Sequence, residues 1–124
     1  MADNVEVVRG AYDAFGRGDV GAIIEMVDDS VQWSSPVMLP QGGDFSGKGG
    51  VQRFFEGLGG AWEKLVVDVE GLGGIGDGVV VAVVQASGSL RAGGSGKYAA
   101  AHVFTVEDGK ITRFREFVDR TVSD

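Results

Sequence analysis

The sequence contains no cysteine, which excludes disulfide bonds and thiolate chemistry. It has no apolar run long enough to span a lipid bilayer, so we expect no membrane partner. The residues after Met1 are Ala, Asp and Asn rather than a basic segment followed by an apolar one, so no signal peptide is expected. We therefore expect a cytoplasmic protein.

Basic side chains are few and scattered. The chain has 11 Lys and Arg against 18 Asp and Glu, which gives a formal net charge of −7. A surface that follows nucleic-acid phosphates needs clustered basic residues, so nucleic acid is not an expected partner. With no cysteine, a single histidine and no calcium-loop spacing, the sequence predicts no metal site, and we expect no cofactor.

Two glycine-rich segments match nucleotide-binding motifs by their letters alone. "GLGGIG" at 71–76 fits G-x-G-x-x-G, but the strand-like "DGVVVAVV" follows it where the dinucleotide motif requires a helix. "GGDFSGK" at 42–48 fits the start of a phosphate-binding loop, but Gly49 stands where Ser or Thr would bind magnesium. We interpret the second segment as a flexible loop before a helix. The 22 glycines are expected at tight turns and bends of a curved sheet.

The period of the hydrophobic pattern changes along the chain. Helical spacing predicts helices over 4–15, 20–27 and 49–58, with Asp19 as the N-cap of the second. β-type runs predict strands over 30–35, 63–71, 78–90, 98–107 and 110–122. Helices first, followed by strands joined by hairpins, indicate a single domain, 1–124, of the α+β class with a mainly antiparallel sheet.

The turn in "VEDGKI", residues 106–111, decides which side chains share a face with His102, the only histidine of the chain. One register has a two-residue turn, 108–109, that pairs Val106 with Ile111. It brings the arginines at 113 and 115 and Asp119 onto the face of His102. Charged groups that are buried there need partners, which the sequence does not supply.

The other register has a three-residue turn, 107–109, with Gly109 in the left-handed conformation and a bulge, and it pairs Val106 with Lys110. One face of the hairpin is then apolar except for His102 and Glu116. The side chains that share this face with them are Phe104, Val106, Thr112, Phe114 and Val118. The outer face carries Val103, Ile111, Arg113, Arg115, Phe117 and Asp119. We predict this second register because it buries no unpaired arginine.

His102 and Glu116 on neighbouring strands, among apolar side chains, suit a general acid and base. The alternative is a purely structural hydrogen bond between two buried groups, or a Glu116 that leans out to an arginine. Both interpretations stay open from the residues alone.

Four segments resemble one known family: "YDAFGRGD", "AIIEMVDDSVQW", "FSGKGGVQRFF" and "HVFTVEDGKITRFREFVD". They are similar to the SnoaL-like and ketosteroid-isomerase-like branch of the nuclear-transport-factor-2-like superfamily, and the resemblance covers nearly the whole chain. It implies a cone-shaped, curved, mainly antiparallel sheet that wraps around the N-terminal helices and encloses an apolar cavity. It also implies a homodimer formed through the outer face of the sheet.

The resemblance assigns roles to individual residues. His102 and Glu116 match a histidine on the penultimate strand and an acidic base on the last strand of SnoaL-like polyketide cyclases, in which the acid is usually Asp. The base of steroid isomerases falls near Ser34 or Ser35, which cannot act as one. The tyrosine of the isomerases aligns with Ala11, one position from Tyr12.

Relatives of limonene-epoxide hydrolase use an Asp–Arg–Asp set. Glu116 matches its last member, whereas the arginine and the first aspartate fall near Val83 and Gln85. The resemblance therefore argues against epoxide hydrolysis by the same three residues.

These observations predict an enzyme that acts without a cofactor on a small, largely apolar carbonyl compound, such as a polyketide-derived ring precursor. Glu116 would remove a C–H proton, and His102 would donate a hydrogen bond to the enolate oxygen or return the proton. The alternatives are a ligand-binding or dimerisation module of the same fold, and hydrolysis with Glu116 activating a water. The expected substrate-binding side chains are Tyr12, Trp33, Phe54, Gln85, Phe104, Phe114 and Val118.

Overall fold

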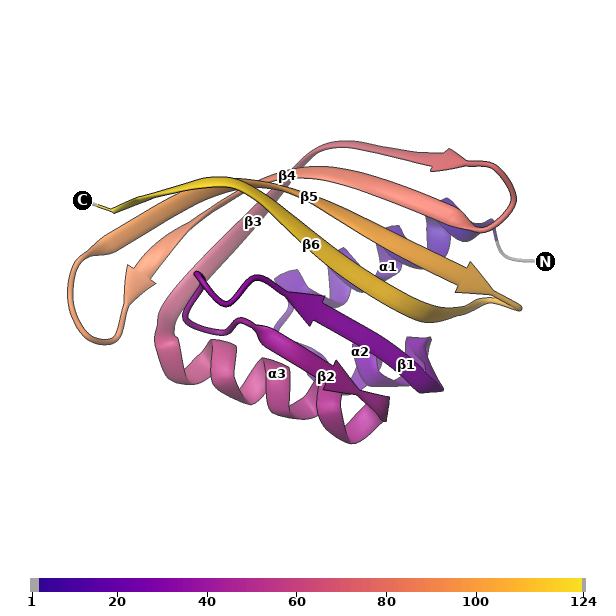
Figure 1. Ribbon diagram of the computed structural model, residues 1–124, viewed down its shortest axis with the longest axis horizontal. Helices are drawn as coiled ribbons and strands as arrows, with labels where there is room; N and C mark the ends of the chain where they lie inside the picture. Colours follow the sequence, from indigo (N-terminus) through magenta and orange to yellow (C-terminus); the bar gives the residue numbers. More distant parts are fainter. Residues whose placement is uncertain (1–2, 124) are drawn as a thin grey trace.

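The structure, a computed structural model, describes residues 3–123, which form three helices and six strands (Figure 1). The helices are α1 (Asn4–Gly16), α2 (Val20–Met26) and α3 (Gly47–Ala61). The strands are β1 (Val27–Ser35), β2 (Gly43–Ser46), β3 (Trp62–Ile75), β4 (Val79–Leu90), β5 (Ser95–Glu107) and β6 (Lys110–Ser123). The predicted helices and strands are all present, but β2 lies in a segment that the sequence predicts as a flexible loop.

The six strands form one curved, open sheet in the order β2-β1-β6-β5-β4-β3. All neighbouring strands are antiparallel except β1 and β6, which are parallel, so the sheet is mixed. The register shifts twice between β3 and β4 and twice between β5 and β6. Such bulges bend a strand and increase its twist, which lets the sheet curl around the helices. Figure 1 shows α1 and α2 behind the sheet and α3 beside β1 and β2.

The hairpin of β5 and β6 combines features of both registers considered from the sequence. The turn is the two-residue one: Val106 pairs with Ile111, and the residues at 108 and 109 have φ values of 53° and 77°. Positive φ at both positions is the signature of a type I′ turn. The predicted three-residue turn is therefore wrong, and the bulge lies further along, at Thr112.

The bulge at Thr112 restores the predicted face beyond it, because one extra residue in β6 reverses the alternation of its side chains. Phe104 pairs with Phe114, and His102 pairs with Glu116. Ile111 lies before the bulge and is fully buried, which corrects its predicted position on the outer face.

The helices cover the concave face of the sheet, and their apolar sides build the core with the inward residues of the strands. Asp3 and Asp19 cap α1 and α2 by accepting hydrogen bonds from backbone N–H groups, which confirms the predicted cap at Asp19. Each large aliphatic side chain that is fully buried contributes about 1.5–3 kcal/mol. These side chains are Val8, Val27, Val31, Val51, Val80, Val84 and Ile111. Within residues 3–123, none of the helices has the length and hydropathy that crossing a membrane requires.

Candidate active site

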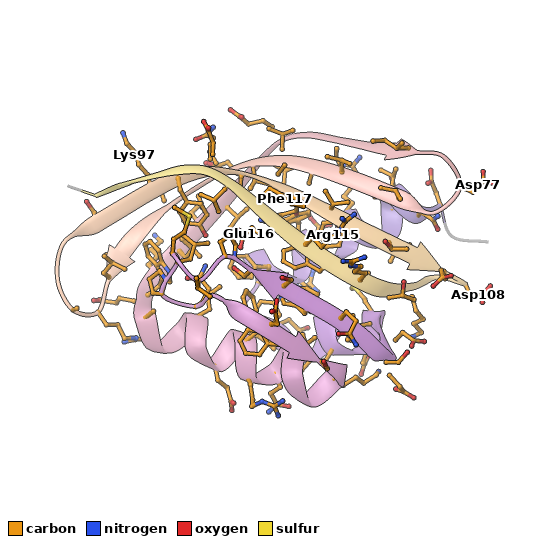
Figure 2. All side chains as sticks on the ribbon, viewed as in Figure 1. Asp77, Lys97, Asp108, Arg115, Glu116 and Phe117 are labelled. Atoms are coloured by element: carbon orange, nitrogen blue, oxygen red, sulfur yellow. The ribbon has the colours of Figure 1, made fainter. Side chains whose placement is uncertain are left out.

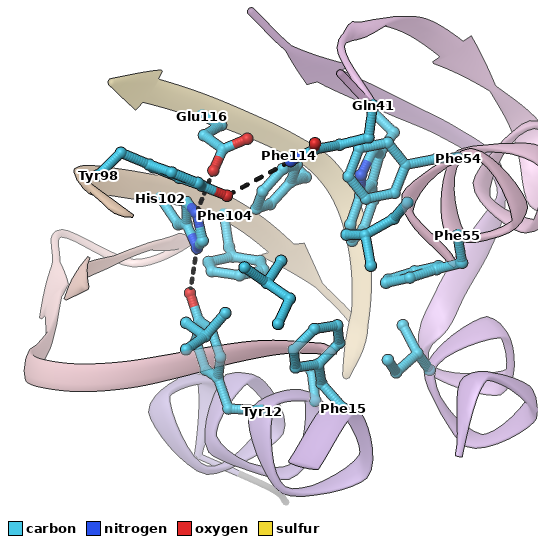
Figure 3. A pocket seen from close by; sticks show the side chains of 16 residues that line it. Tyr12, Phe15, Gln41, Phe54, Phe55, Tyr98, His102, Phe104, Phe114 and Glu116 are labelled. Atoms are coloured by element: carbon cyan, nitrogen blue, oxygen red, sulfur yellow. Dashed lines mark hydrogen bonds and ion pairs between the residues drawn. The ribbon is translucent and has the colours of Figure 1, made fainter. Parts of the chain in front are cut away.

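A pocket of about 70 Å³ lies between the concave face of the sheet and the helices (Figure 3). Its polar lining side chains are Tyr12, Gln41, Tyr98, His102 and Glu116. The rest of the lining is apolar and comes from all three helices and from the strands. It consists of Ala11, Phe15, Ile23, Trp33, Phe54, Phe55, Leu58, Leu65, Val67, Phe104 and Phe114.

His102 and Glu116 form a buried pair at the sheet side of this pocket. They are directly opposite each other on β5 and β6, and Nε2 of His102 lies 2.8 Å from Oε2 of Glu116. The two residues are 7% and 8% exposed. Arg115 and Phe117 flank Glu116 along β6 (Figure 2) and point to the opposite face, since side chains alternate along a strand. The hairpin thus brings the two predicted site residues together, while their chemical role stays a prediction.

Two further side chains extend the pair into a chain of four hydrogen-bonded groups. The hydroxyl oxygen of Tyr12, on α1, lies 2.6 Å from Nδ1 of His102. The hydroxyl of Ser35, at the end of β1, donates to Oε1 of Glu116 at 2.6 Å. Four separate elements therefore fix the position of one carboxylate and one imidazole.

One assignment of protons gives every bond of this chain a donor and an acceptor. In this assignment, Glu116 accepts from Ser35 and from the Nε2–H of His102, and Tyr12 donates its hydroxyl proton to Nδ1. Both ring nitrogens of His102 are then occupied, so the imidazole offers no free nitrogen to a molecule in the pocket. Direct donation from His102 to a substrate oxygen would require one of these two bonds to break, and this expected role of His102 stays a prediction. Glu116 keeps unused lone pairs on both carboxylate oxygens.

The two tyrosines of the pocket are held in their neutral form. Burial, and then the negative charge of Glu116, raises the pKa of Tyr12 well above its ordinary value of 10.0. The same two causes, in the same order, raise the pKa of Tyr98, and a hydrogen bond with Gln41 opposes them only partly. Both phenols are therefore hydrogen-bonding groups rather than bases at neutral pH.

A second polar cluster contributes Gln41 and Tyr98 to the pocket lining. Nε1 of Trp62 donates to Oε1 of Gln41 at 3.0 Å, and Nε2 of Gln41 donates to the hydroxyl oxygen of Tyr98 at 3.3 Å. All three residues are buried. Gln41 lies in the loop between β1 and β2, and it joins that loop to the starts of β3 and β5.

The predicted substrate-binding residues divide into two groups. Tyr12, Trp33, Phe54, Phe104 and Phe114 line the pocket, and the rings of Trp33 and Phe114 are stacked with their centroids 4.2 Å apart. The other two predictions do not fit the pocket, because Val118 packs against the core outside the lining and Gln85 is on the wrong face.

Gln85 is exposed because the side chains at 80, 82, 84 and 86 are those that β4 turns inward. Its amide lies 3.4 Å from the carboxylate of Glu70. Val83 shares the outer face. The two positions at which the epoxide-hydrolase pattern needs an arginine and an aspartate therefore point away from the pocket.

The structural roles of Ser35, Gln41, Trp62 and Tyr98 were not predicted from the sequence. Alternation along β5 could have found Tyr98, because it lies four residues before His102 and hence on the same face. The family resemblance presents Ser35 only as a replacement for a base. Gln41 gave no signal, since a polar residue in a loop has no periodicity to mark it as buried.

Ionisable side chains do not gather into a metal site. Among residues 3–123, no group of three or more His, Asp or Glu side chains is arranged to hold a metal ion.

Comparison with solved structures identifies the fold. An NTF2-like protein from Burkholderia thailandensis superposes with a TM-score of 0.88 and 29% sequence identity, over 96% of this chain and 92% of its own. TerC, co-crystallised with polyporic acid, has a TM-score of 0.82 and 23% identity over 94% of this chain and 91% of its own. Rv0760c from Mycobacterium tuberculosis, in complex with estradiol-17β-hemisuccinate, has a TM-score of 0.82 and 17% identity over 98% and 99%. At the last two identities the likeness concerns the fold alone.

Sequence comparison identifies the family. No curated protein matches the chain significantly. A sequence profile of the SnoaL-like domain matches residues 8–114, which is most of the chain. With an α+β architecture shared with NTF2-like structures, this protein belongs to the SnoaL-like domain family.

Proposed function

We propose that this protein is an acid–base enzyme that acts without a cofactor on a small, largely apolar carbonyl compound, with Glu116 as the base. The observation that carries the proposal is the carboxylate of Glu116 in an apolar pocket, bound by Ser35 at 2.6 Å and by His102 at 2.8 Å. These two bonds fix the carboxylate and leave lone pairs free for a substrate proton. The apolar lining limits water, which strengthens electrostatic interactions within the pocket.

The reaction begins at a carbon next to the carbonyl group. Its C–H bond breaks, Glu116 takes the proton, and the electron pair forms an enolate with its negative charge on oxygen. The enolate takes the proton back at a different carbon, which is isomerisation, or its carbon attacks a second carbonyl of the same molecule, which closes a ring. In ring closure the π bond of the second carbonyl breaks, and its oxygen takes the proton from Glu116, which restores the carboxylate. His102 and Tyr12 act as positioning residues, since His102 is bonded to Glu116 and Tyr12 is bonded to His102.

The size of the pocket sets a condition on the substrate. About 70 Å³ is roughly half of the ~150 Å³ of an apolar cavity that admits benzene. A ring-sized molecule therefore enters only when lining side chains move outward. Phe15 on α1 and Phe55 and Leu58 on α3 are the suitable ones, because they are half-buried while the aromatic lining at the sheet is buried.

A second candidate function is binding of a small molecule without chemistry. Every group of the Tyr12–His102–Glu116–Ser35 chain finds a partner within the protein, as in a purely structural network. TerC and Rv0760c were crystallised with small organic molecules, which supports binding in this fold but does not distinguish the two candidates.

Solvent exchange separates the two candidates. We choose 2-indanone as the probe, because it is an apolar ring ketone with acidic C–H bonds beside the carbonyl. Proton NMR in D₂O measures the exchange of these hydrogens for deuterium, and a titration followed by the same spectra measures binding. The acid–base proposal predicts exchange that is faster with the protein and saturates with 2-indanone. Saturable binding with exchange at the rate of buffer alone would support the second candidate.

We also propose that two copies associate through the outer face of the sheet, as the family resemblance implies. Val83, Ala101 and Phe117 are neighbours in one row across β4, β5 and β6. Val83 is 47% exposed and Phe117 is 53% exposed. A contiguous apolar row on a sheet face is typical of a surface that another protein covers.

A further inference from the structure

The Gln41–Trp62–Tyr98 cluster has a fixed direction of hydrogen bonding. The indole N–H of Trp62 can only donate, so the atom of Gln41 that faces it at 3.0 Å must be the carbonyl Oε1. The amide nitrogen of Gln41 therefore faces Tyr98 and donates to its hydroxyl oxygen at 3.3 Å. The indole thus settles an amide orientation that is otherwise ambiguous.

This direction leaves the hydroxyl proton of Tyr98 available. Because Tyr98 accepts from Gln41, its own O–H must donate to a different group. Among residues 3–119, whose side chains the structure describes, none accepts a hydrogen bond from it. Tyr98 is only 6% exposed and lines the pocket, and in Figure 3 its ring extends from beside Glu116 and His102 toward Gln41.

The two tyrosines of the pocket thus differ in function. In the proton assignment given above, Tyr12 donates its proton to His102, so it has none to offer to a ligand. His102 has both nitrogens occupied. The hydroxyl of Tyr98 has a proton and no acceptor within the described residues. The indole N–H of Trp33, also in the lining, likewise has no partner there. Tyr98 is the one of these two donors that lies beside Glu116.

We propose that Tyr98 donates a hydrogen bond to the carbonyl oxygen of the substrate and to the enolate oxygen that develops from it, and that Gln41 and Trp62 position Tyr98 for this task. The inference rests on the proposed function, and it adds to the proposed base, Glu116, the group that binds the substrate oxygen. It assigns the ligand class as ketones, or similar oxygen acceptors, on an apolar frame. Such a molecule would place its oxygen at Tyr98 and the adjacent C–H at Glu116.

Protons and electrons balance without another reactant. Glu116 takes the proton from carbon, the C–H electron pair becomes part of the enolate, and the negative charge develops on the oxygen that faces Tyr98. Tyr98 keeps its proton, since burial and the charge of Glu116 raise the pKa of its phenol. When Glu116 returns the proton to carbon, the carbonyl reforms. A fixed donor at a developing oxyanion contributes about 10²–10³ to a rate.

The test uses the infrared carbonyl band of 2-indanone labelled with ¹³C at the carbonyl, measured on the bound ligand. A hydrogen bond from Tyr98 lowers the stretching frequency below its value in an apolar solvent. Tyr98→Phe should return the frequency toward that value and slow deuterium exchange by about 10²-fold, with a smaller loss of affinity. The melting temperature of each variant confirms that the fold is retained.

Gln41→Glu tests the positioning role and keeps the hydroxyl. A carboxylate at position 41 accepts from both Trp62 and Tyr98, so it turns the Tyr98 proton away from the pocket. This variant should therefore reproduce the band shift of Tyr98→Phe. Gln52→Glu is the matched control, because it makes the same change at an exposed position of α3, and it should leave the band unchanged.

Three outcomes would overturn the proposal: a carbonyl frequency that does not respond to Tyr98→Phe, a Gln41→Glu spectrum like that of the parent, or no saturable binding of 2-indanone. Failure of the proposed function looks different. In that case the parent shows the lowered frequency and its Tyr98 dependence but does not accelerate exchange, which supports Tyr98 as a donor and contradicts Glu116 as a base.

Discussion

Tyr12 on α1 and His102 on β5 are joined by a hydrogen bond of 2.6 Å between the phenol oxygen and Nδ1, although 90 residues separate them in sequence. Tyr12 also meets Phe104 edge to face, with ring centroids 5.9 Å apart. The bond attaches the first helix to the middle of the sheet. In the proton assignment given above, the phenol donates to Nδ1, and the Nε2–H of His102 faces Glu116.

Tyr12→Phe should destabilise the protein by about 1–3 kcal/mol, because it keeps the ring and leaves Nδ1 of His102 buried without a partner. Urea unfolding measures the change. The control is the same substitution in a His102→Leu background, where no nitrogen remains to lose its partner and the effect should be small. Equal effects in the two backgrounds would show that packing of Tyr12, and not its bond to His102, is what matters.

The two tyrosines of the chain should resist ionisation. Both have a pKa raised above the ordinary value of 10.0, so above pH 10 the folded state holds more protons than the unfolded state. The corresponding stabilisation is complete below pH 10 and is lost as pH rises further. Ultraviolet titration of phenolate should therefore show ionisation that coincides with loss of structure by circular dichroism. If phenolate formed near pH 10 while the protein stayed folded, the phenols of Tyr12 and Tyr98 would not be buried as the structure shows.

Two Gly→Ala substitutions should have opposite effects. A Cβ at Gly42 would lie 1.8 Å from the backbone oxygen of Pro36, so the loop that carries Gln41 must rearrange, at a cost of about 1–3 kcal/mol. At Gly57 on α3, no atom outside the helix backbone and the adjacent residues lies within 4 Å of the position that a Cβ would take. Alanine at position 57 should therefore stabilise the helix by up to about 1 kcal/mol. Thermal unfolding of both variants checks the pair. If Gly42→Ala left the thermal stability unchanged, Gly42 would not lie as close to the backbone of Pro36 as the structure shows.

Phe117→Asp should shift the protein from dimer to monomer, because it places a charge in the apolar row across β4, β5 and β6. Sedimentation velocity over a range of concentrations measures the change. Val37→Asp is the control, since Val37 is 87% exposed in the loop before β2, away from this row. A parent protein that is monomeric at every concentration would contradict the proposed dimer.

Much of the fold follows from sequence because local patterns are strong here. Helical spacing and the cap at Asp19 predict α1 and α2, and the β-branched runs predict the long strands. The sequence does not reveal β2, because a four-residue strand among glycines has no pattern and forms only by pairing with β1. The parallel pairing of β1 with β6 joins distant segments and has no local signature.

Only part of the candidate site can be predicted from local sequence patterns. The face shared by His102 and Glu116 follows from avoiding buried arginines, even though the predicted turn is wrong and the bulge lies at Thr112. In β4 the run "VVVAVV" is apolar at every position, so it does not reveal that Gln85 faces outward. The partners of this pair, Tyr12 and Ser35, reach it from distant elements. Contacts of this kind depend on how helices and loop ends dock on the sheet.

The most direct test of the account is the rate at which Glu116→Gln catalyses deuterium exchange into 2-indanone. Gln keeps the shape of the side chain and removes the base, so the rate should fall by about 10²–10⁴-fold while 2-indanone still binds. Glu107→Gln makes the same change at an exposed position of the same hairpin and should retain the parental rate. If Glu116→Gln exchanged the ketone as fast as the parent, Glu116 would not be the base and the proposed chemistry would be wrong.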